Sequence, residues 1–469
     1  MKKLLFALFV FASFTASFGQ TLLASHPLEL KKSKSNHQIL NAVNSKNQIF
    51  IFATDKEKVK ILKYSPFLFF SDSLTINRPY KDYEFMAGYG FEDDGNPCLY
   101  WASEDLKKMQ SVCFNFETKI NKVDNFQFDF KDESILNTFS ENNSFYILTL
   151  PKKEDKLKFY VLNKGEMDEK VLDFSSYNFT DSQGKPKTFN ELITEEGLET
   201  IDTKTLNPLF KCVGKSKMYF SENRMILTFD SNTKTQILEI NLNNFSISEK
   251  NIPQQTMAKN IGKSNSYYFQ DKLYMLKTNE EELSIAAVDL KSQEVIKKYY
   301  ADTKDTISFR NSPLFSQTGD QQGRALKNTK KFLQRLNASD VGLSVYKTPN
   351  SIMVTAGGVR NVSSAGNMII GITAGVAMVA TGSGGDVGSL FNAGDLQSTY
   401  FEALFDDQFE HQNTPQQELA VDYISKFLSE NDVDLQSVFA FKGYYILGYY
   451  DSKKKEYVMR KFEDVSEFN

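Results

Sequence analysis

Histidine is the side chain most often used to move protons near neutral pH, and this chain of 469 residues contains three, His26, His37 and His411. His26 and His37 precede the repeated part of the sequence that is described below. A histidine-based catalytic triad, or a metal site built from several histidines, therefore lacks the residues it needs.

Neighbouring carboxylates occur as two pairs, Asp406 with Asp407 and Glu195 with Glu196. A glycoside hydrolase needs two carboxyl groups that face each other across the scissile bond. Because the chain has 59 acidic residues, several such pairs are expected by number alone. The two pairs therefore leave carboxylate chemistry open and do not predict it.

Two loops resemble ligand-binding loops in composition. Residues 92–96, Glu-Asp-Asp-Gly-Asn, are rich in oxygen ligands, but they lack the alternating acids of a calcium loop and favour a hairpin turn. Residues 383–386, Ser-Gly-Gly-Asp, lack both the Gly-Lys-Ser/Thr ending and the Gly-x-Gly-x-x-Gly spacing of phosphate loops. The sequence predicts no cofactor, no metal ligand and no catalytic residue.

Three cysteines are too few for a disulfide framework or a structural zinc site. Residues 98–103 and 108–113 read as a hairpin whose register sets Cys98 opposite Cys113. Directly opposed residues of antiparallel strands lie about 4.5–5.5 Å apart at Cα, within reach of a disulfide. The alternatives are a Cys98–Cys113 disulfide or two small buried thiols, and Cys212 is expected to be buried and unpaired.

A pattern of apolar runs separated by polar turns recurs seven times along the chain. At one position of the second run, the copies lie 48, 48, 79, 49, 78 and 93 residues apart. Three intervals therefore match one unit near 48 residues, and three contain a unit and an insertion. The runs favour Phe, Tyr, Ile and Val, which suit a pleated, half-buried strand. The second runs are 48–52, 98–101, 145–148, 225–227, 273–276, 352–354 and 444–447.

Each copy reads as an antiparallel meander that cannot bury its own faces, which resembles one blade of a β-propeller. A charged fourth run, as at 169–174, 245–250 and 294–300, suits an outer edge strand guarded against pairing with other molecules. The resemblance is to the superfold in general and covers about nine-tenths of the chain. It implies an all-β fold of seven four-stranded blades, with helical and glycine-rich insertions, and carries no activity by itself.

Insertions are expected at about 175–213, 302–338 and 357–434, within a single domain that spans residues 20–469. The first ends in a short helix near 190–198, and the second contains a basic amphipathic helix near 323–336. The third holds ten of the 24 glycines between residues 357 and 394, and the simplest interpretation of this segment is a flap folded against the propeller. After it, Thr414-Pro415-Gln416-Gln417 predicts a capping box that opens a helix to about Glu430.

Residues 1–19 are typical of a signal peptide, with Lys2 and Lys3 before an apolar stretch and small residues at 17–19. Cleavage after Gly19 exposes Gln20 rather than Cys, so a lipoprotein is not expected. An uncleaved anchor is the alternative, although the stretch is short for a span of about 20 residues. We therefore expect a protein that is periplasmic or extracellular.

The formal net charge of −4 becomes −6 when Lys2 and Lys3 are removed with the signal peptide. A mildly acidic protein is poorly suited to nucleic acid, and membrane association is not favoured. The expected partner is a protein or a glycan.

Propeller loops form a broad binding face without any catalytic group, so we expect an exported, non-catalytic binding or interaction module. One alternative is a carboxylate- or metal-dependent hydrolase or lyase that acts on carbohydrate or lactone at the channel mouth. Another is a protein that associates with membranes through the glycine-rich segment 357–394.

Overall fold

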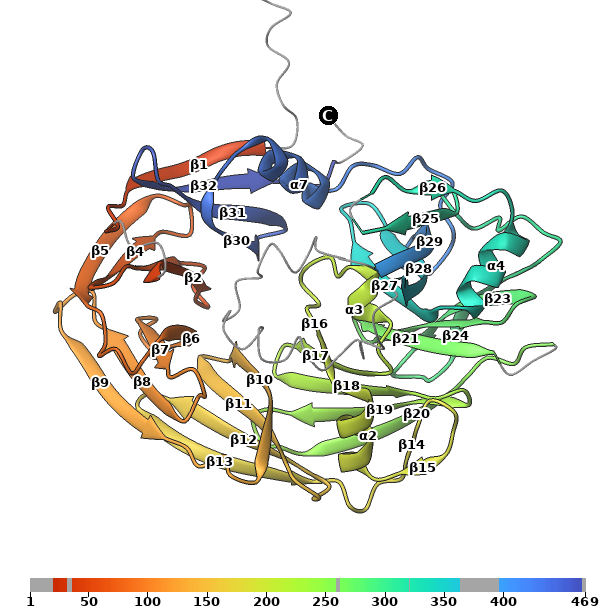
Figure 1. Cartoon of the computed structure of the whole chain (residues 1–469), viewed down its shortest axis with the longest axis horizontal. Coiled ribbons are helices and arrows are strands. Elements are labelled where there is room, and N and C mark those ends of the chain that lie inside the picture. The colour runs from red at the N-terminus through yellow and green to blue at the C-terminus, as the bar shows by residue number, and fades with distance from the viewer. Residues whose placement is uncertain (1–19, 32–35, 259–261, 320, 363–395, 466–469) are drawn as a thin grey trace, which may run out of the picture.

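The fold is a ring of antiparallel sheets (Figure 1). It is taken from a computed structural model that describes residues 20–31, 36–258, 262–319, 321–362 and 396–465. In this part of the chain, seven sheets have four or five strands and one small sheet has two. Sheets arranged around a common centre define a β-propeller, so the predicted all-β propeller is confirmed.

Four of these sheets follow chain order strictly, with the first strand toward the centre of the ring in Figure 1. The first contains β2 (Gln38–Val43), β3 (Ile49–Thr54), β4 (Lys58–Tyr64) and β5 (Phe70–Asn77). The second contains β6 (Phe85–Phe91), β7 (Pro97–Ala102), β8 (Lys108–Phe114) and β9 (Asn121–Gln127). The third contains β10 (Glu133–Glu141), β11 (Ser144–Pro151), β12 (Lys156–Asn163) and β13 (Glu166–Asp173). The other contains β21 (Lys263–Phe269), β22 (Lys272–Thr278), β23 (Glu282–Asp289) and β24 (Val295–Asp302).

Two sheets carry a fifth strand where the repeat predicts four. One adds the parallel inner strand β16 (Glu199–Ile201) to β17 (Ser216–Ser221), β18 (Arg224–Asp230), β19 (Lys234–Asn241) and β20 (Ile247–Pro253). The other runs β27 (Asp340–Lys347), β28 (Ile352–Asn361), β29 (Leu396–Phe405), β25 (Phe315–Thr318) and β26 (Arg324–Ala325). Its outer strands precede its inner ones in the chain, so part of the expected insertion at 302–338 completes a sheet.

The last sheet joins the two ends of the chain. It contains β30 (Asp434–Phe441), β31 (Tyr444–Asp451), β32 (Glu456–Phe462) and β1 (Gln20–Pro27). β1 pairs with β32 from Gln20 opposite Phe462 to Pro27 opposite Glu456. The sequence does not predict this strand, because β1 precedes the repeated part of the chain.

Burial explains why these segments are strands. All six residues of β3 are buried, because sheets pack against both of its faces, and the other second strands are also almost wholly buried. The outer strand β5 instead alternates between exposed and half-buried residues. Each predicted second run coincides with one strand, apart from Gln48, which precedes β3; the strands are β3, β7, β11, β18, β22, β28 and β31.

Tight turns fix the register of the hairpins. At 142–143, 270–271 and 442–443 both central residues have positive φ, the backbone that two-residue hairpin turns require. Gly443, with φ of 84°, occupies one of these positions without steric cost. The acidic loop at 92–96 is likewise a turn, in which the Gly95 amide donates to the carbonyl of Glu92.

In the described residues, four helices and the small sheet occupy the connections. The helices are α2 (Phe189–Glu196), α3 (Leu209–Cys212), α4 (Thr329–Asn337) and α7 (Ala420–Glu430), and the small sheet pairs β14 (Phe179–Thr180) with β15 (Pro186–Lys187). None of the helices in the described residues is long and apolar enough to cross a membrane.

Two helix boundaries differ from the prediction. α4 begins at Thr329 rather than near 323, because Arg324 and Ala325 pair in β26 and the Asn328 side chain accepts from the Lys331 amide. α7 begins at Ala420 rather than near Pro415, because Asn311 binds the carbonyls of Gln412 and Thr414 and holds that segment extended. The predicted capping box at 414–417 is therefore wrong.

The strands that flank the glycine-rich segment pair with each other. β28 and β29 pair from Ile352 opposite Phe405 to Asn361 opposite Leu396. Residues 363–395, which include most of that segment and the loop at 383–386, lie outside the described residues, as do the predicted signal residues 1–19.

Candidate functional site

A pocket of about 670 Å³ lies where the β27–β28 turn meets the extended segment before α7. Its floor is apolar, because Met353, Leu404 and Leu419 are nearly inaccessible to solvent. Its walls carry amide and hydroxyl groups. These are contributed by Thr348, Asn350, Ser351, Gln412, Asn413, Thr414, Gln416 and Gln417.

Local hydrogen bonds shape both walls of the pocket. In the turn, Thr348 accepts from the Ser351 amide at 3.0 Å, and its own hydroxyl donates to the Ser351 carbonyl. In the facing segment, Asn311 Nδ2 donates to the carbonyls of Gln412 at 2.7 Å and Thr414 at 2.9 Å. Because these contacts fix the backbone, exposed side chains such as Asn413 can project toward a ligand.

The amino-terminal end of α7 gathers carboxyl groups beside the pocket. Asp464 accepts the Ala420 amide at 2.8 Å and the Tyr346 hydroxyl at 2.9 Å. Asp422 accepts the Leu419 amide at 2.8 Å. Negative charge is stabilised there, because the first amides of a helix lack intrahelical acceptors.

Burial dominates the titration of these carboxyl groups. It raises the pKa of Asp464 although two donors oppose the shift, and it raises the pKa of Asp422 although the Leu419 amide opposes it. It also raises the pKa of Glu402, whose carboxylate accepts Gln416 Nε2 at 2.5 Å. Among the residues that line the pocket, Asp464 alone contributes a carboxyl group, so the lining does not place two acids face to face.

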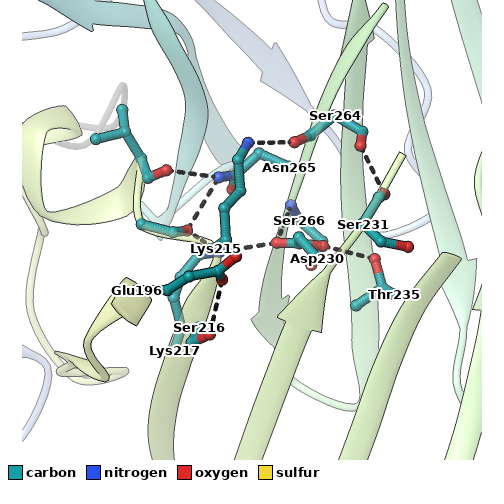
Figure 2. A network of polar contacts seen from close by, with 12 residues as sticks. Glu196, Lys215, Ser216, Lys217, Asp230, Ser231, Thr235, Ser264, Asn265 and Ser266 are labelled. Atoms are coloured by element: carbon teal, nitrogen blue, oxygen red, sulfur yellow. Dashed lines mark hydrogen bonds and ion pairs between the residues drawn. The ribbon is translucent and has the colours of Figure 1, made fainter. Parts of the chain in front are cut away.

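A second polar site is buried between the sheet of β17 and the sheet of β21 (Figure 2). Lys217 Nζ lies 2.9 Å from Asp230 Oδ2, and neither side chain is exposed. The Thr235 hydroxyl donates to Asp230 at 2.6 Å and the Ser266 amide donates to it at 2.9 Å. Burial favours a raised pKa for Asp230, but Lys217 and Thr235 outweigh it and hold the pKa below its usual value.

Lys215 extends this network to the neighbouring sheet. Its ammonium group donates to the Ser264 carbonyl at 2.6 Å, and the Ser264 hydroxyl donates to the Ser231 carbonyl (Figure 2). Burial lowers the pKa of Lys215 to about 8, although Asp230 acts in the opposite direction. The network therefore contains Lys215, whose pKa is lowered, beside Lys217, which is ion-paired, and it holds the two adjacent sheets together.

The expected insertion at 175–213 ends inside the ring. β16 pairs in parallel with β17, and α3 contacts β27 and β28. Between them, the Asn207 carbonyl accepts the Ser344 hydroxyl at 2.7 Å, and the Leu206 amide donates to the Tyr445 hydroxyl at 2.9 Å. Residues 199–213 therefore link the sheets of β17, β27 and β31 on the inner side of the ring (Figure 1).

The structure joins Cys98 and Cys113 through their sulfur atoms, with 3.9 Å between the Cα atoms. The predicted register is observed, since Cys98 lies opposite Cys113 in the β7–β8 ladder. Glu92 lies near both sulfurs, and these three residues are close enough together to hold a metal ion. A thiolate rather than a disulfide is the metal ligand, so the bonded state does not offer this set. Cys212 is buried and forms no disulfide.

The other residues singled out in the sequence have separate local contacts. Asp406 accepts amides of its own turn, Asp407 pairs with Lys347, and Glu195 pairs with Lys187. The two acid pairs thus do not form one site. His26 stacks on Phe70, and His411 contacts Asn311 at 3.0 Å.

Neither the pocket nor the buried network is predicted by the sequence. Residues 414–417 favour a helix start, although the amide-rich composition of 412–417 equally suits a polar wall. Lys217 lies within a largely apolar strand, and this position indicates a buried ion pair, because a charged side chain lies on a buried face only where it has a partner.

No protein-family model matches the chain, and no curated protein matches it. Solved structures that resemble it include a member of the duf4221 family from Bacteroides vulgatus, 10% identical over 92% of this chain and all of the other, with a TM-score of 0.30. The WD40 domain of SCAP from fission yeast is 10% identical over 94% of this chain and 97% of the other, with a TM-score of 0.30. A prolyl endopeptidase is 9% identical over 92% of this chain and 51% of the other, with a TM-score of 0.36. At these identities and TM-scores, the likenesses carry no argument about what this protein does.

Proposed function

We propose that the protein is an exported, non-catalytic binding module that holds an uncharged polar ligand, a segment of protein or a glycan, in the pocket beside α7. The observation that carries the proposal is the lining. Five side-chain amides and three hydroxyls surround an apolar floor. Amides offer both donors and acceptors, so they match peptide groups and sugar hydroxyls better than they match ions.

The extended segment at 412–418 supports this assignment. It is held by Asn311 and by Val465, whose amide donates to the Glu418 carbonyl at 3.4 Å. A wall fixed before the ligand arrives loses little conformational entropy on binding, and this loss is a main cost of association.

A carboxylate-dependent hydrolase acting on carbohydrate or lactone is the second candidate, and Asp464 is the observation that favours it. A carboxyl group with a raised pKa can serve as a general acid. That chemistry also needs a second carboxylate across the ligand, which the lining does not supply. Binding without turnover is therefore the better supported function.

The test begins with the purified protein on a glycan array and on a tiled array of uncharged decapeptides. The strongest binder is then measured by calorimetry against Asn413→Trp, which fills the mouth of the pocket, and against Gln416→Ala. Lys291→Trp, in the exposed β23–β24 turn, adds the same ring elsewhere as the matched control.

We expect Asn413→Trp to weaken binding at least about tenfold, which corresponds to ~1.4 kcal/mol, while Lys291→Trp leaves it unchanged. Binding that survives Asn413→Trp would place the ligand elsewhere. Hydrolysis of the bound probe that Asp464→Asn abolishes would establish the second candidate instead. Export is tested separately, by the N-terminal residue of the protein recovered outside the cytoplasm, which we expect to be Gln20.

A further inference from the structure

The turn between β4 and β5 displays aromatic rings to solvent. Phe67 is 77% exposed, Phe69 is 73% exposed and Phe70 is 43% exposed. Single exposed apolar side chains are ordinary on a protein surface, but several at one turn tip form a patch that marks an interaction site.

The turn is firmly built, so its rings are displayed by the fold. The Ser65 amide donates to the Phe69 carbonyl at 2.8 Å, and the Leu68 amide donates to the Ser65 carbonyl at 2.9 Å. Leu68 has a positive φ of 67° and packs against the core, which leaves the rings on either side of it outside. His26 of β1 stacks on Phe70 with ring centroids 3.9 Å apart and fixes the base of the turn.

The neighbouring β8–β9 turn extends the patch. Ile120 in this turn is 69% exposed. Lys119 beside it reaches across to Asp72 of β5, with 2.5 Å between Nζ and Oδ2. Phe67, Phe69, Phe70 and Ile120 therefore belong to two sheets that the Lys119–Asp72 ion pair links, and we call these four exposed side chains together the turn patch.

Lysine side chains stand beside this patch. Lys442 Nζ donates to the Pro66 carbonyl at 2.7 Å and lies 5.4 Å from the centre of the Phe67 ring. Lys63 Nζ lies 5.1 Å from the centre of the Phe116 ring. Within the part of the chain that the structure describes, neither lysine is within 4 Å of a carboxylate, whereas Lys119 is paired with Asp72. Both ammonium groups remain able to bind anions, although Lys63 lies opposite Asp72 in the β4–β5 ladder and its charge helps to lower the pKa of that carboxyl group.

We propose that the turn patch docks on a lipid surface that contains anionic phospholipids, with Phe67 and Phe69 inserted among the headgroups and Lys442 and Lys63 against their phosphates. Apolar insertion combined with nearby cations is the arrangement by which peripheral proteins bind bilayers. A bilayer accepts a protruding tip, whereas a protein partner must offer a complementary hollow. The overall acidic charge opposes binding only at long range, because salt screens it beyond about 10 Å.

The experiment measures flotation of the purified protein with vesicles of phosphatidylcholine, alone or with roughly one-third phosphatidylglycerol. An apolar signal segment would itself bind vesicles, so the N-terminus of each preparation is first established by mass spectrometry. Phe67→Ser/Phe69→Ser removes the tip, and Lys442→Glu reverses one charge. Tyr80→Ser, which removes a ring that is 70% exposed in the β5–β6 connection, is the matched control.

We expect binding to vesicles that contain phosphatidylglycerol, a loss of at least about tenfold in Phe67→Ser/Phe69→Ser, a smaller loss in Lys442→Glu, and no change in Tyr80→Ser. A Phe69→Trp variant should show a blue shift of its fluorescence with vesicles, because the native Trp101 is fully buried and will not respond. Absence of flotation with both vesicle types, or flotation that the double variant retains, would overturn the proposal. A concentration-dependent dimer that the double variant abolishes would overturn it too, since a second copy then covers the patch.

Discussion

Lys217 and Asp230 form an ion pair of 2.9 Å in which neither side chain reaches solvent. Removal of one member of such a pair leaves a buried charge without compensation, which costs far more than the net contribution of the pair. The Lys217 ammonium also donates to the Gly214 carbonyl, and so the pair fixes the start of β17 against the end of α3.

Lys217→Met is therefore expected to lower the free energy of unfolding by about 3–5 kcal/mol, measured by urea denaturation. The double variant Lys217→Met/Asp230→Leu should lose less than the single variant, because no charge is then left unpaired. An equal loss in both variants would mean that the packing of Lys217, rather than its charge, stabilises the fold.

Lys215→Met tests the effect of the lowered pKa of Lys215, which lies in the same buried network as this ion pair. The pKa of Lys215 is lowered from 10.5 to about 8 by burial, so below pH 8 the lysine is charged in both the folded and unfolded states and its burial cost is fully present. Between pH 8 and 10.5 the unfolded chain binds the additional proton, and the contribution of this group to stability rises with pH.

The melting temperature of Lys215→Met minus that of the native protein should therefore fall by a few degrees between pH 7 and pH 10. Differential scanning fluorimetry across this range measures it. Lys291→Met, in the exposed β23–β24 turn, is the control, and its difference should stay constant. A constant difference for Lys215→Met as well would contradict the expected titration.

The disulfide between Cys98 and Cys113 should appear as one linked peptide in mass spectrometry without reduction, with Cys212 alkylated only after unfolding. A bridge that closes a loop of 15 residues stabilises a chain by about 3 kcal/mol in the chain-entropy model. Cys98→Ala/Cys113→Ala should lower the melting temperature accordingly. Alkylation of all three cysteines without reduction would show two free thiols instead.

Replacement of residues 363–395 by a short Gly-Ser turn should leave the melting temperature within a few degrees. The reason is that Asn361 and Leu396 are already paired, so a short hairpin turn can join them. Deletion from Gly358 to Gln397 should be clearly more destabilising, since it removes four ladder pairs and the bonds from Arg360 to Gln397. Failure of the shorter deletion to fold would show that the replaced residues contribute to the core.

The sequence predicts the propeller because each unit carries the same apolar rhythm, and strand periodicity is local information. It does not predict β1, whose eight residues copy no repeat and gain a partner only through β32 at the far end of the chain. It misplaces the start of α7 for a related reason. The capping box at Thr414 is a local signal, and the two hydrogen bonds from the side chain of Asn311, about a hundred residues away, override it.

The pocket and the turn patch lie beyond the reach of sequence for different reasons. Asn350 and Asn413 line the same pocket only because two connections that are distant in the sequence meet in the fold. Phe67 and Phe69 lie in an apolar run, and their exposure becomes visible only in the folded turn, where Leu68 has a positive φ and packs inward.

Pairing of β1 with β32 also has a consequence for synthesis. In the described residues, the first strand, β1, must wait for the last one, β32. Until then the other six large sheets can form, while β1 remains a lone segment with open hydrogen-bonding groups. Contacts this distant in sequence form slowly, and a chain that stops before Glu456 never forms them. Full-length molecules can close their ring, whereas prematurely terminated ones retain an open edge that is prone to aggregate and accessible to proteases.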